Sequence, residues 1–177
     1  MVHNVAYGGP GHPYGHALGI YMRCGLNMLI ANNTFDDIDY WQLVIELSSG
    51  FSASVDGFTM VNNVMSQDGD KVYAIGSNLP GTIRIDNNLT WEYRRGTGVY
   101  ASVAGEGDAT SIEQFRQWTG FDAHTIYANP LYVNRDGFDL HLAGGSPGID
   151  TGMPIAGVTT GYSGRGPDIG RYESGVN

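Results

Sequence analysis

"IANNTF" at residues 30–35 returns in altered form as "MVNNVM" at 60–65 and "RIDNNLTW" at 84–91. The second Asn of each pair is Asn33, Asn63 or Asn88, so the pairs are 30 and then 25 residues apart. A repeat of this length is typical of architectures in which each unit stacks on the previous one and all units share one core.

The residues around the Asn pairs also recur. Positions three and five residues before the second Asn are apolar, and they share strand parity. They are Ile30, Met60 and Ile85, then Met28, Phe58 and Ile83. Twelve residues after it come Ile45, Ile75 and Tyr100, which predicts a register without gaps. Each unit therefore reads as a strand, an Asn turn, a polar loop, a second strand and a turn, and "ALGIYM" (17–22) resembles the second strand of an earlier unit.

Two all-β arrangements fit such units. A meander of hairpins favours Asn-Gly or Asp-Gly turns, but the two Asp-Gly pairs at 56–57 and 68–69 do not occupy equivalent positions. A solenoid favours equivalent residues in columns, where stacked Asn side chains hydrogen-bond along the column. Asn also tolerates the left-handed backbone of a sharp corner. The repeat favours the solenoid, with Asn pairs at a corner of each coil.

The repeats resemble coils of right-handed parallel β-helix proteins of the pectate-lyase-like group. "GHALGIYM" (15–22) is similar to a strand of that group, and two C-terminal stretches resemble the end of its carbohydrate-active bacterial members. These stretches are "ANPLYVNRDGFDLHLAGGSPGIDTG" (128–152) and "GPDIGRYE" (166–173). The resemblance implies an all-β, right-handed parallel β-helix of about four coils. It does not imply one activity, because this fold carries lyases, hydrolases, epimerases, tailspikes and adhesins.

One short helix is expected between the coils and the tail. In "GDATSIEQFRQWTGFD" (107–122), Thr110 and Glu113 form a capping-box pattern and Gly120 can end the helix. The stripe Ile112, Phe115, Trp118 predicts an amphipathic helix over 111–119 that packs on a coil or covers an open end. We expect a single domain, with coils over 1–105 and a helix plus C-terminal capping segment over 106–177.

Bulk composition narrows the classes of partner. The net charge of −9, with only 9 Lys and Arg residues, argues against nucleic acid. No stretch is long and apolar enough to predict a membrane span. The start "MVHNVAYGGP" lacks the features of a signal peptide, so the expected extracellular or cell-surface location rests on the resemblance alone. Cys24 is the only cysteine and is expected to be a buried, inert thiol.

The polar loops after the Asn pairs are the candidate site. They read "TFDDIDYW" (34–41), "VMSQDGDK" (64–71) and "LTWEYRRG" (89–96), and strands of neighbouring coils lie about 4.8 Å apart. Acidic, basic and aromatic side chains therefore gather along one edge, as lyases and glycoside hydrolases require. The catalytic candidates are Asp37, Asp39, Glu92, Arg94 and Arg95, and the candidates for stacking on sugar rings are Trp41, Trp91 and Tyr93.

Simpler interpretations of these loops remain open. Asp39 with Arg94, and Asp70 with Arg95, can instead form surface ion pairs worth at most about 1 kcal/mol each. No cofactor is expected, although the acidic residues at 36, 37 and 39 leave Ca²⁺ binding open, without an EF-hand pattern. His12 and His16 are separated by Gly and Pro, so they lack the helical geometry of a metal site.

Two functions from different classes follow. The first is a carbohydrate-associated β-helix that binds polysaccharide and is a lyase, a glycoside hydrolase or a fragment of one. The second is a non-catalytic, self-assembling solenoid such as an adhesin, tailspike or filament subunit. It would self-associate through the N-terminal coil around "ALGIYM", because an uncapped coil exposes unpaired backbone groups.

Overall fold

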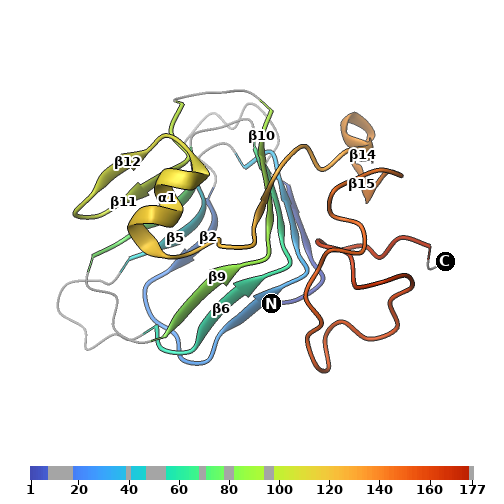
Figure 1. Ribbon diagram of the computed structural model, residues 1–177, viewed down its shortest axis with the longest axis horizontal. Coiled ribbons are helices and arrows are strands. Elements are labelled where there is room, and N and C mark those ends of the chain that lie inside the picture. Colours follow the sequence, from blue (N-terminus) through green and yellow to red (C-terminus); the bar gives the residue numbers. More distant parts are fainter. Residues whose placement is uncertain are drawn as a thin grey trace.

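The structure is a computed structural model that describes residues 1–7, 18–38, 41–46, 55–67, 71–77, 82–93 and 98–175. Strands from successive repeats form three mainly parallel sheets, here called A, B and C (Figure 1). Each repeat contributes one strand to A, the next to B and the next to C, as β3, β4 and β5 do. The chain is thus all-β with stacked parallel sheets and one helix, as the sequence predicts, and the stacking is consistent with a solenoid.

The strands of each sheet come from positions one repeat apart. Sheet A contains β3 (Leu29–Ala31), β6 (Phe58–Val61) and β9 (Ile83–Asp86). Sheet B contains β1 (Val5–Tyr7), β4 (Thr34–Asp36), β7 (Val64–Gln67), β10 (Leu89–Glu92) and β13 (Ile126–Tyr127). Sheet C contains β2 (Leu18–Met22), β5 (Trp41–Ile45), β8 (Lys71–Ile75), β11 (Ala101–Val103) and β12 (Gly107–Ala109). Only β12, which pairs with β11, is antiparallel within these three sheets.

The registers confirm the alignment around the Asn pairs and correct it further on. Ile30 lies beside Met60, and Met60 lies beside Ile85. The predicted alignment of Ile75 with Tyr100 is wrong, because Ile75 lies beside Val103. The loop after β10 is therefore three residues longer than its counterpart. Tyr100 is buried as well, which explains why the repeat aligned it with Ile75.

The second Asn of each pair forms a buried ladder. The side-chain oxygen of Asn63 accepts hydrogen bonds from the backbone N–H (3.0 Å) and the side-chain amide (2.9 Å) of Asn33. Asn63 makes the same two contacts, at 2.9 and 3.1 Å, with the oxygen of Asn88. Asn4 continues the ladder at one end, and Thr125 accepts from the N–H of Asn88 at the other. The ladder satisfies buried backbone groups at a corner where strand pairing is interrupted.

The first Asn of each pair makes the bend. Asn32, Asn62 and Asn87 have φ values of 50°, 58° and 53°, in the left-handed region that Asn tolerates. His3 occupies the equivalent position before Asn4, with φ 51°. Corner geometry therefore explains why the residues come in pairs: one residue turns the chain and the next joins the ladder.

The main core lies between the three sheets, and the helix covers its late end. Helix α1 (Ile112–Thr119) buries Ile112 and Phe115, and the ring of Phe115 stacks on Tyr73 at 5.0 Å. Figure 1 shows α1, in yellow, lying against the sheets beside β11 and β12. The N-cap is Ser111, whose side chain accepts from the N–H of Gln114, and not the predicted Thr110. Gly120 ends the helix with φ 72°, as predicted.

The C-terminal segment lies along the side of the stack (Figure 1, orange to red). The sequence had instead suggested a cap over one end of the stack. The segment begins with β14 (Tyr132–Asn134), the 3₁₀ turn η1 (Arg135–Gly137) and β15 (Asp139–Leu142), and it continues without further helices or strands to residue 175. Val64 and Leu89 of sheet B pack against its Leu142 and Ile169 in a second apolar cluster.

The tail also bonds the outer corners of the stack. The Asn32 amide donates to the carbonyl oxygen of Asp168 at 3.0 Å, and that of Asn62 donates to Met153 O at 2.7 Å. His3 Nε2 lies 3.2 Å from the carbonyl oxygen of Val158. The tail thus joins three successive corners.

Cys24 is exposed, so the prediction of a buried thiol is wrong. The residue follows the end of β2 in a connection between sheets, where its side chain faces solvent. Within the described ranges, no helix has the length and apolar character needed to cross a lipid bilayer.

Candidate functional site

Part of the predicted loop site gathers at one edge of sheet B. Glu92 lies beside Gln67 in the register, and Trp91 lies beside Ser66, as the loop alignment requires. The N–H of Asp37 donates to the carbonyl oxygen of Ser66 at 3.1 Å, which places Asp37 at the same edge. Trp91 contacts the ring of Tyr127 at 5.5 Å between centroids. Four of the eight candidates, Asp37, Glu92, Trp91 and Tyr93, therefore occupy this edge.

A buried ion pair, which the loop alignment did not reveal, dominates that edge. The guanidinium Nε of Arg135 donates to both carboxylate oxygens of Asp36, at 3.0 and 2.9 Å, and Asp36 is fully buried. The hydroxyl of Ser66 donates to the same carboxylate at 2.5 Å, and Tyr132 Oη lies 2.7 Å from that hydroxyl. The guanidinium carbon of Arg135 lies 4.0 Å from the ring centroid of Tyr93.

This cluster ties the C-terminal segment to sheet B. Desolvation, followed by the negative charge of Asp36, raises the pKa of Tyr132 well above its usual value, so the phenol is neutral. The Asp36 carboxylate thus receives the shared Nε–H of Arg135 and the hydroxyl of Ser66, both from protein groups. Asp36 and Arg135 therefore act as an anchor for β14 and η1.

Three of the remaining loop candidates fall outside the described residues. Asp39, Arg94 and Arg95 lie outside the described residues, as does Asp70, so neither the catalytic interpretation nor the ion-pair interpretation of them is tested. His12 and His16 are also outside. Among the described residues, no group of three or more His, Cys, Asp or Glu side chains is arranged to hold a metal ion.

Trp41 lies on another surface, here called the sheet C groove. A column of side chains crosses the outer face of sheet C in register, and each member lies beside the next. Its members are Tyr21, Val44, Ala74, Ser102 and Asp108. Four strand spacings give this column a length of about 19 Å. Around its middle is a groove of about 340 Å³, whose lining includes Trp41, Val44, Ala74, Ser102 and Asp108.

Charged groups border the groove beside Trp41. Lys71 lies next to Trp41 in the register, and its Nζ is 5.9 Å from the indole centroid. The same Nζ donates to Ser102 Oγ at 2.7 Å and lies 3.4 Å from Asp108. Hydrogen bonding from the Ser102 hydroxyl, with a smaller contribution from Lys71, lowers the pKa of Asp108. The network therefore presents an ionised carboxylate and an ammonium group near one aromatic ring.

A second carboxylate lies near the other end of the column. Glu46 follows β5 and accepts a hydrogen bond of 2.6 Å from the hydroxyl of Tyr21. Arg23 donates to that same hydroxyl at 2.8 Å. The floor between Glu46 and Asp108 consists of the small side chains of Val44 and Ala74, so a flat ligand can approach the sheet closely.

Some of these residues could have been identified from the sequence. The 30-residue repeat places Lys71 one unit after Trp41, and the His3–Asn4 pair precedes Asn33 by nearly the same interval. Asp108 reaches the groove through an antiparallel hairpin, and Arg135 reaches sheet B from outside the repeats. Neither has a signal in the repeat spacing.

The comparisons do not assign a family. No protein-family model matches the chain, and searches of curated proteins and of solved structures likewise gave no match. The function is therefore inferred from the geometry and from the sequence resemblance.

Proposed function

We propose that the chain is a right-handed parallel β-helix of about four coils that binds a polysaccharide in the sheet C groove. The observation that carries this proposal is the column across sheet C, whose small middle side chains lie beside Trp41, Lys71 and Asp108. Sugar rings combine an apolar face with hydroxyl edges. The indole can stack on that face, while the ammonium and carboxylate groups bond hydroxyls. The proposed setting is extracellular, as in the carbohydrate-active proteins that the repeats resemble.

Charge favours one class of glycan. The chain has a net charge of −9, and two carboxylates, Glu46 and Asp108, border the groove. A polyanionic chain would meet unfavourable potential there unless cations such as Ca²⁺ bridged it. The proposed ligand is therefore a neutral glycan several sugars long, matching the length of the column.

Catalysis by this groove is the stronger form of the proposal. A glycoside hydrolase needs two carboxylates, and a lyase needs a base together with a cation that neutralises the uronate. Glu46 follows β5 and Asp108 lies on β12, three strand spacings or about 14 Å away, which is too far for a hydrolase pair. The groove therefore suits the second reaction better, with Asp108 as the base and Lys71 as the cation. Turnover of neutral and uronate glycans, measured with and without chelator, separates these two reactions from binding alone.

Binding is tested by calorimetry with neutral and uronate oligosaccharides on the wild type and two matched variants. Trp41→Ala should weaken binding about tenfold, because removing a stacked ring loses on the order of 1.5 kcal/mol of apolar burial. Trp91→Ala removes the same residue type at the sheet B edge and should leave the affinity unchanged. Absence of binding to any glycan, or a loss only in Trp91→Ala, contradicts the proposed groove.

Self-association is a second candidate function, favoured by the early end of the stack. Strands β1 and β2 end their sheets, so each has a strand neighbour on one side only within the described residues, whereas Val2 already bridges the outer side of β3 at Ala31. Large apolar side chains are exposed near them, namely Val2, Val5, Tyr21, Leu26 and Met28. An edge of this kind can pair with a second copy of the chain.

Light scattering over a range of concentrations tests this second function. Val5→Lys places a charge on the 41% exposed side chain of an edge strand and should dissociate a dimer without disturbing the core. Ile20→Lys is unsuitable, because Ile20 packs against the main core and the variant would unfold. A particle of 19.1 kDa at every concentration excludes self-association.

A further inference from the structure

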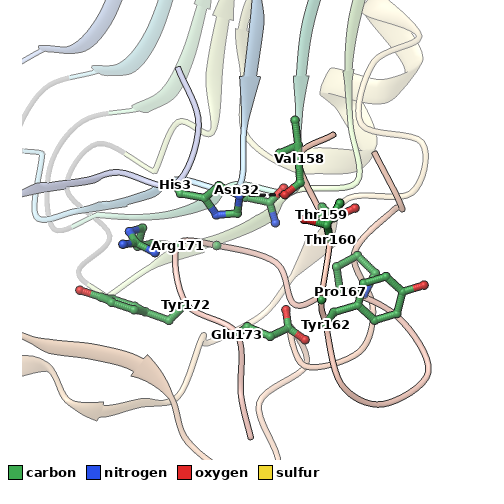
Figure 2. Close-up of a pocket in the computed structure, with 12 residues that line it drawn as sticks. His3, Asn32, Val158, Thr159, Thr160, Tyr162, Pro167, Arg171, Tyr172 and Glu173 are labelled. Atoms are coloured by element: carbon green, nitrogen blue, oxygen red, sulfur yellow. Dashed lines mark hydrogen bonds between the residues drawn. The ribbon is translucent and has the colours of Figure 1, made fainter. Parts of the chain in front are cut away.

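A separate cavity, here called the tail pocket, lies between the C-terminal segment and the first two corners of the stack. Its volume is about 200 Å³. His3 and Asn32 contribute from the corners, and Thr160, Tyr162, Arg171 and Glu173 contribute from the tail (Figure 2). The pocket lies away from sheet C and shares no lining residue with the sheet C groove.

Hydrogen bonds fix both walls of the pocket. His3 and Asn32 bond the carbonyl oxygens of Val158 and Asp168, and the N–H of Arg171 donates to Thr34 Oγ1 at 3.0 Å. A cavity whose walls are bonded on both sides is largely formed before a ligand arrives, which lowers the ordering cost of binding.

The guanidinium of Arg171 is available to a ligand. Within the described residues it forms no ion pair, and it lies 5.2 Å from the ring centroid of Tyr172. In contrast, Arg135 and Lys71 each contact a carboxylate. Unlike Arg116, whose guanidinium donates to two backbone carbonyl oxygens, Arg171 makes no side-chain hydrogen bond within the described residues. Its planar fork suits a carboxylate, which it can bind through two parallel hydrogen bonds.

The rest of the pocket suits hydroxyl groups. Glu173 Oε2 accepts the N–H of Asp168 at 2.9 Å, so this carboxylate is held in place and can accept from a ligand hydroxyl. Desolvation raises the pKa of Glu173. The hydroxyls of Thr160 and Tyr162 have no protein hydrogen bond within the described residues. A carboxylate near Arg171 and hydroxyls near Glu173 would each meet a complementary group.

We propose that the tail pocket binds one sugar acid, a uronate monosaccharide or a uronate at the end of a chain. The carboxylate pairs with Arg171, and ring hydroxyls bond Glu173, Thr160 and Tyr162. The volume fits a single ring and not a polysaccharide, so this site is distinct from the extended sheet C groove and does not depend on it.

Calorimetry on the complete chain with glucuronate, glucose and acetate tests the proposal. Glucose lacks the carboxylate and acetate lacks the hydroxyls, so both should bind at least tenfold more weakly than glucuronate. Arg171→Gln should weaken glucuronate binding at least tenfold, because it removes the charged pair. Arg165→Gln, a tail arginine outside the pocket lining, is the matched control and should bind as the wild type does.

NMR on the wild type keeps the test independent of whether the variants fold. Glucuronate should shift backbone resonances within 158–173 and leave those of β5 and β8 unchanged. Trp41→Ala should retain glucuronate binding, so a failure of the sheet C groove leaves this result intact. The proposal is overturned if glucuronate does not bind, if glucose binds equally well, if Arg171→Gln binds normally, or if the shifts map to sheet C.

Discussion

Truncating the middle rung of the Asn ladder should destabilise the fold more than any other single Asn change in it. Asn63 is fully buried, and its side chain makes five hydrogen bonds. Its amide donates to Asn88 and to the carbonyl oxygens of Ile30 and Val61, and its oxygen accepts both donors of Asn33. Asn63→Ala removes all five in a place that water does not reach.

The magnitude follows from which groups are left without partners. The side-chain amide of Asn33 keeps the carbonyl oxygen of Ala31, but its backbone N–H loses its acceptor. An orphaned buried N–H costs about 1–3 kcal/mol, and each further lost bond costs about 0.5–1.5 kcal/mol. These terms add to about 3–9 kcal/mol. Losses within one network are not additive, so we expect Asn63→Ala to lower the free energy of unfolding by about 3–5 kcal/mol, a large share of the total for a domain of this size.

Asn4→Ala is the matched control for this experiment. Asn4 lies at the exposed end of the ladder, and its backbone N–H still donates to Asn33 after truncation. We expect a loss below about 1 kcal/mol. Urea unfolding followed by tryptophan fluorescence and circular dichroism measures both variants. A stability of Asn63→Ala within 1 kcal/mol of the wild type, or an equal loss in the two variants, would contradict a stabilising role of the ladder.

Three further variants test other parts of the fold. Burial raises the pKa of Asp122 to about 6, so the folded state binds the carboxyl proton more tightly than the unfolded chain does. The protonated carboxyl therefore stabilises the fold below pH 4, and this contribution is lost as the pH rises through 6. Urea unfolding at pH 4 and pH 7 should show the wild type losing on the order of 3 kcal/mol relative to Asp122→Asn, and a pH-independent difference contradicts this. Arg135→Met should cost about 3–5 kcal/mol by stranding the charge of Asp36, part of which Asp36→Asn should restore in the double variant's urea curve. Gly170→Ala should release the tail and speed its cleavage in limited proteolysis, because Gly170 has φ 105° and the new Cβ would lie 2.8 Å from Val64 Cγ2. A variant that resists protease as well as the wild type does would refute this.

The repeat could be predicted from the sequence because few residue types satisfy the backbone conformation and hydrogen bonding of a corner. A left-handed residue followed by a ladder residue can be satisfied by few side chains, and Asn meets both requirements. Strand faces were readable for Ile30, Met60 and Ile85 for a similar reason, since all three point into one core. The helix over 112–119 was predictable from its apolar stripe and from Gly120.

Features that depend on contacts between residues far apart in the sequence could not be predicted. The three extra residues after β10 could not be recognised from the sequence, because the large buried residue Tyr100 stands where the repeat predicts an apolar side chain. The pairing of Asp36 with Arg135 spans 99 residues and lies outside any period. The site prediction placed Trp41 with Trp91, although the two belong to different sheets. Aligning the loops gives the order of residues along one edge of the stack. It does not show on which sheet, or on which face of that sheet, a side chain lies.

The tail that crosses the outer corners changes how the molecule should come apart. Stacked repeats usually interact only with their neighbours, so such proteins can fray from an end one unit at a time. Here Val158 holds His3, Asp168 holds Asn32 and Met153 holds Asn62, which connects the last part of the chain to three separate repeats. Loosening the first repeat must also break tail contacts, so unfolding should be all-or-none. The same feature implies that the nascent chain cannot complete its first corners until the C-terminal residues have left the ribosome.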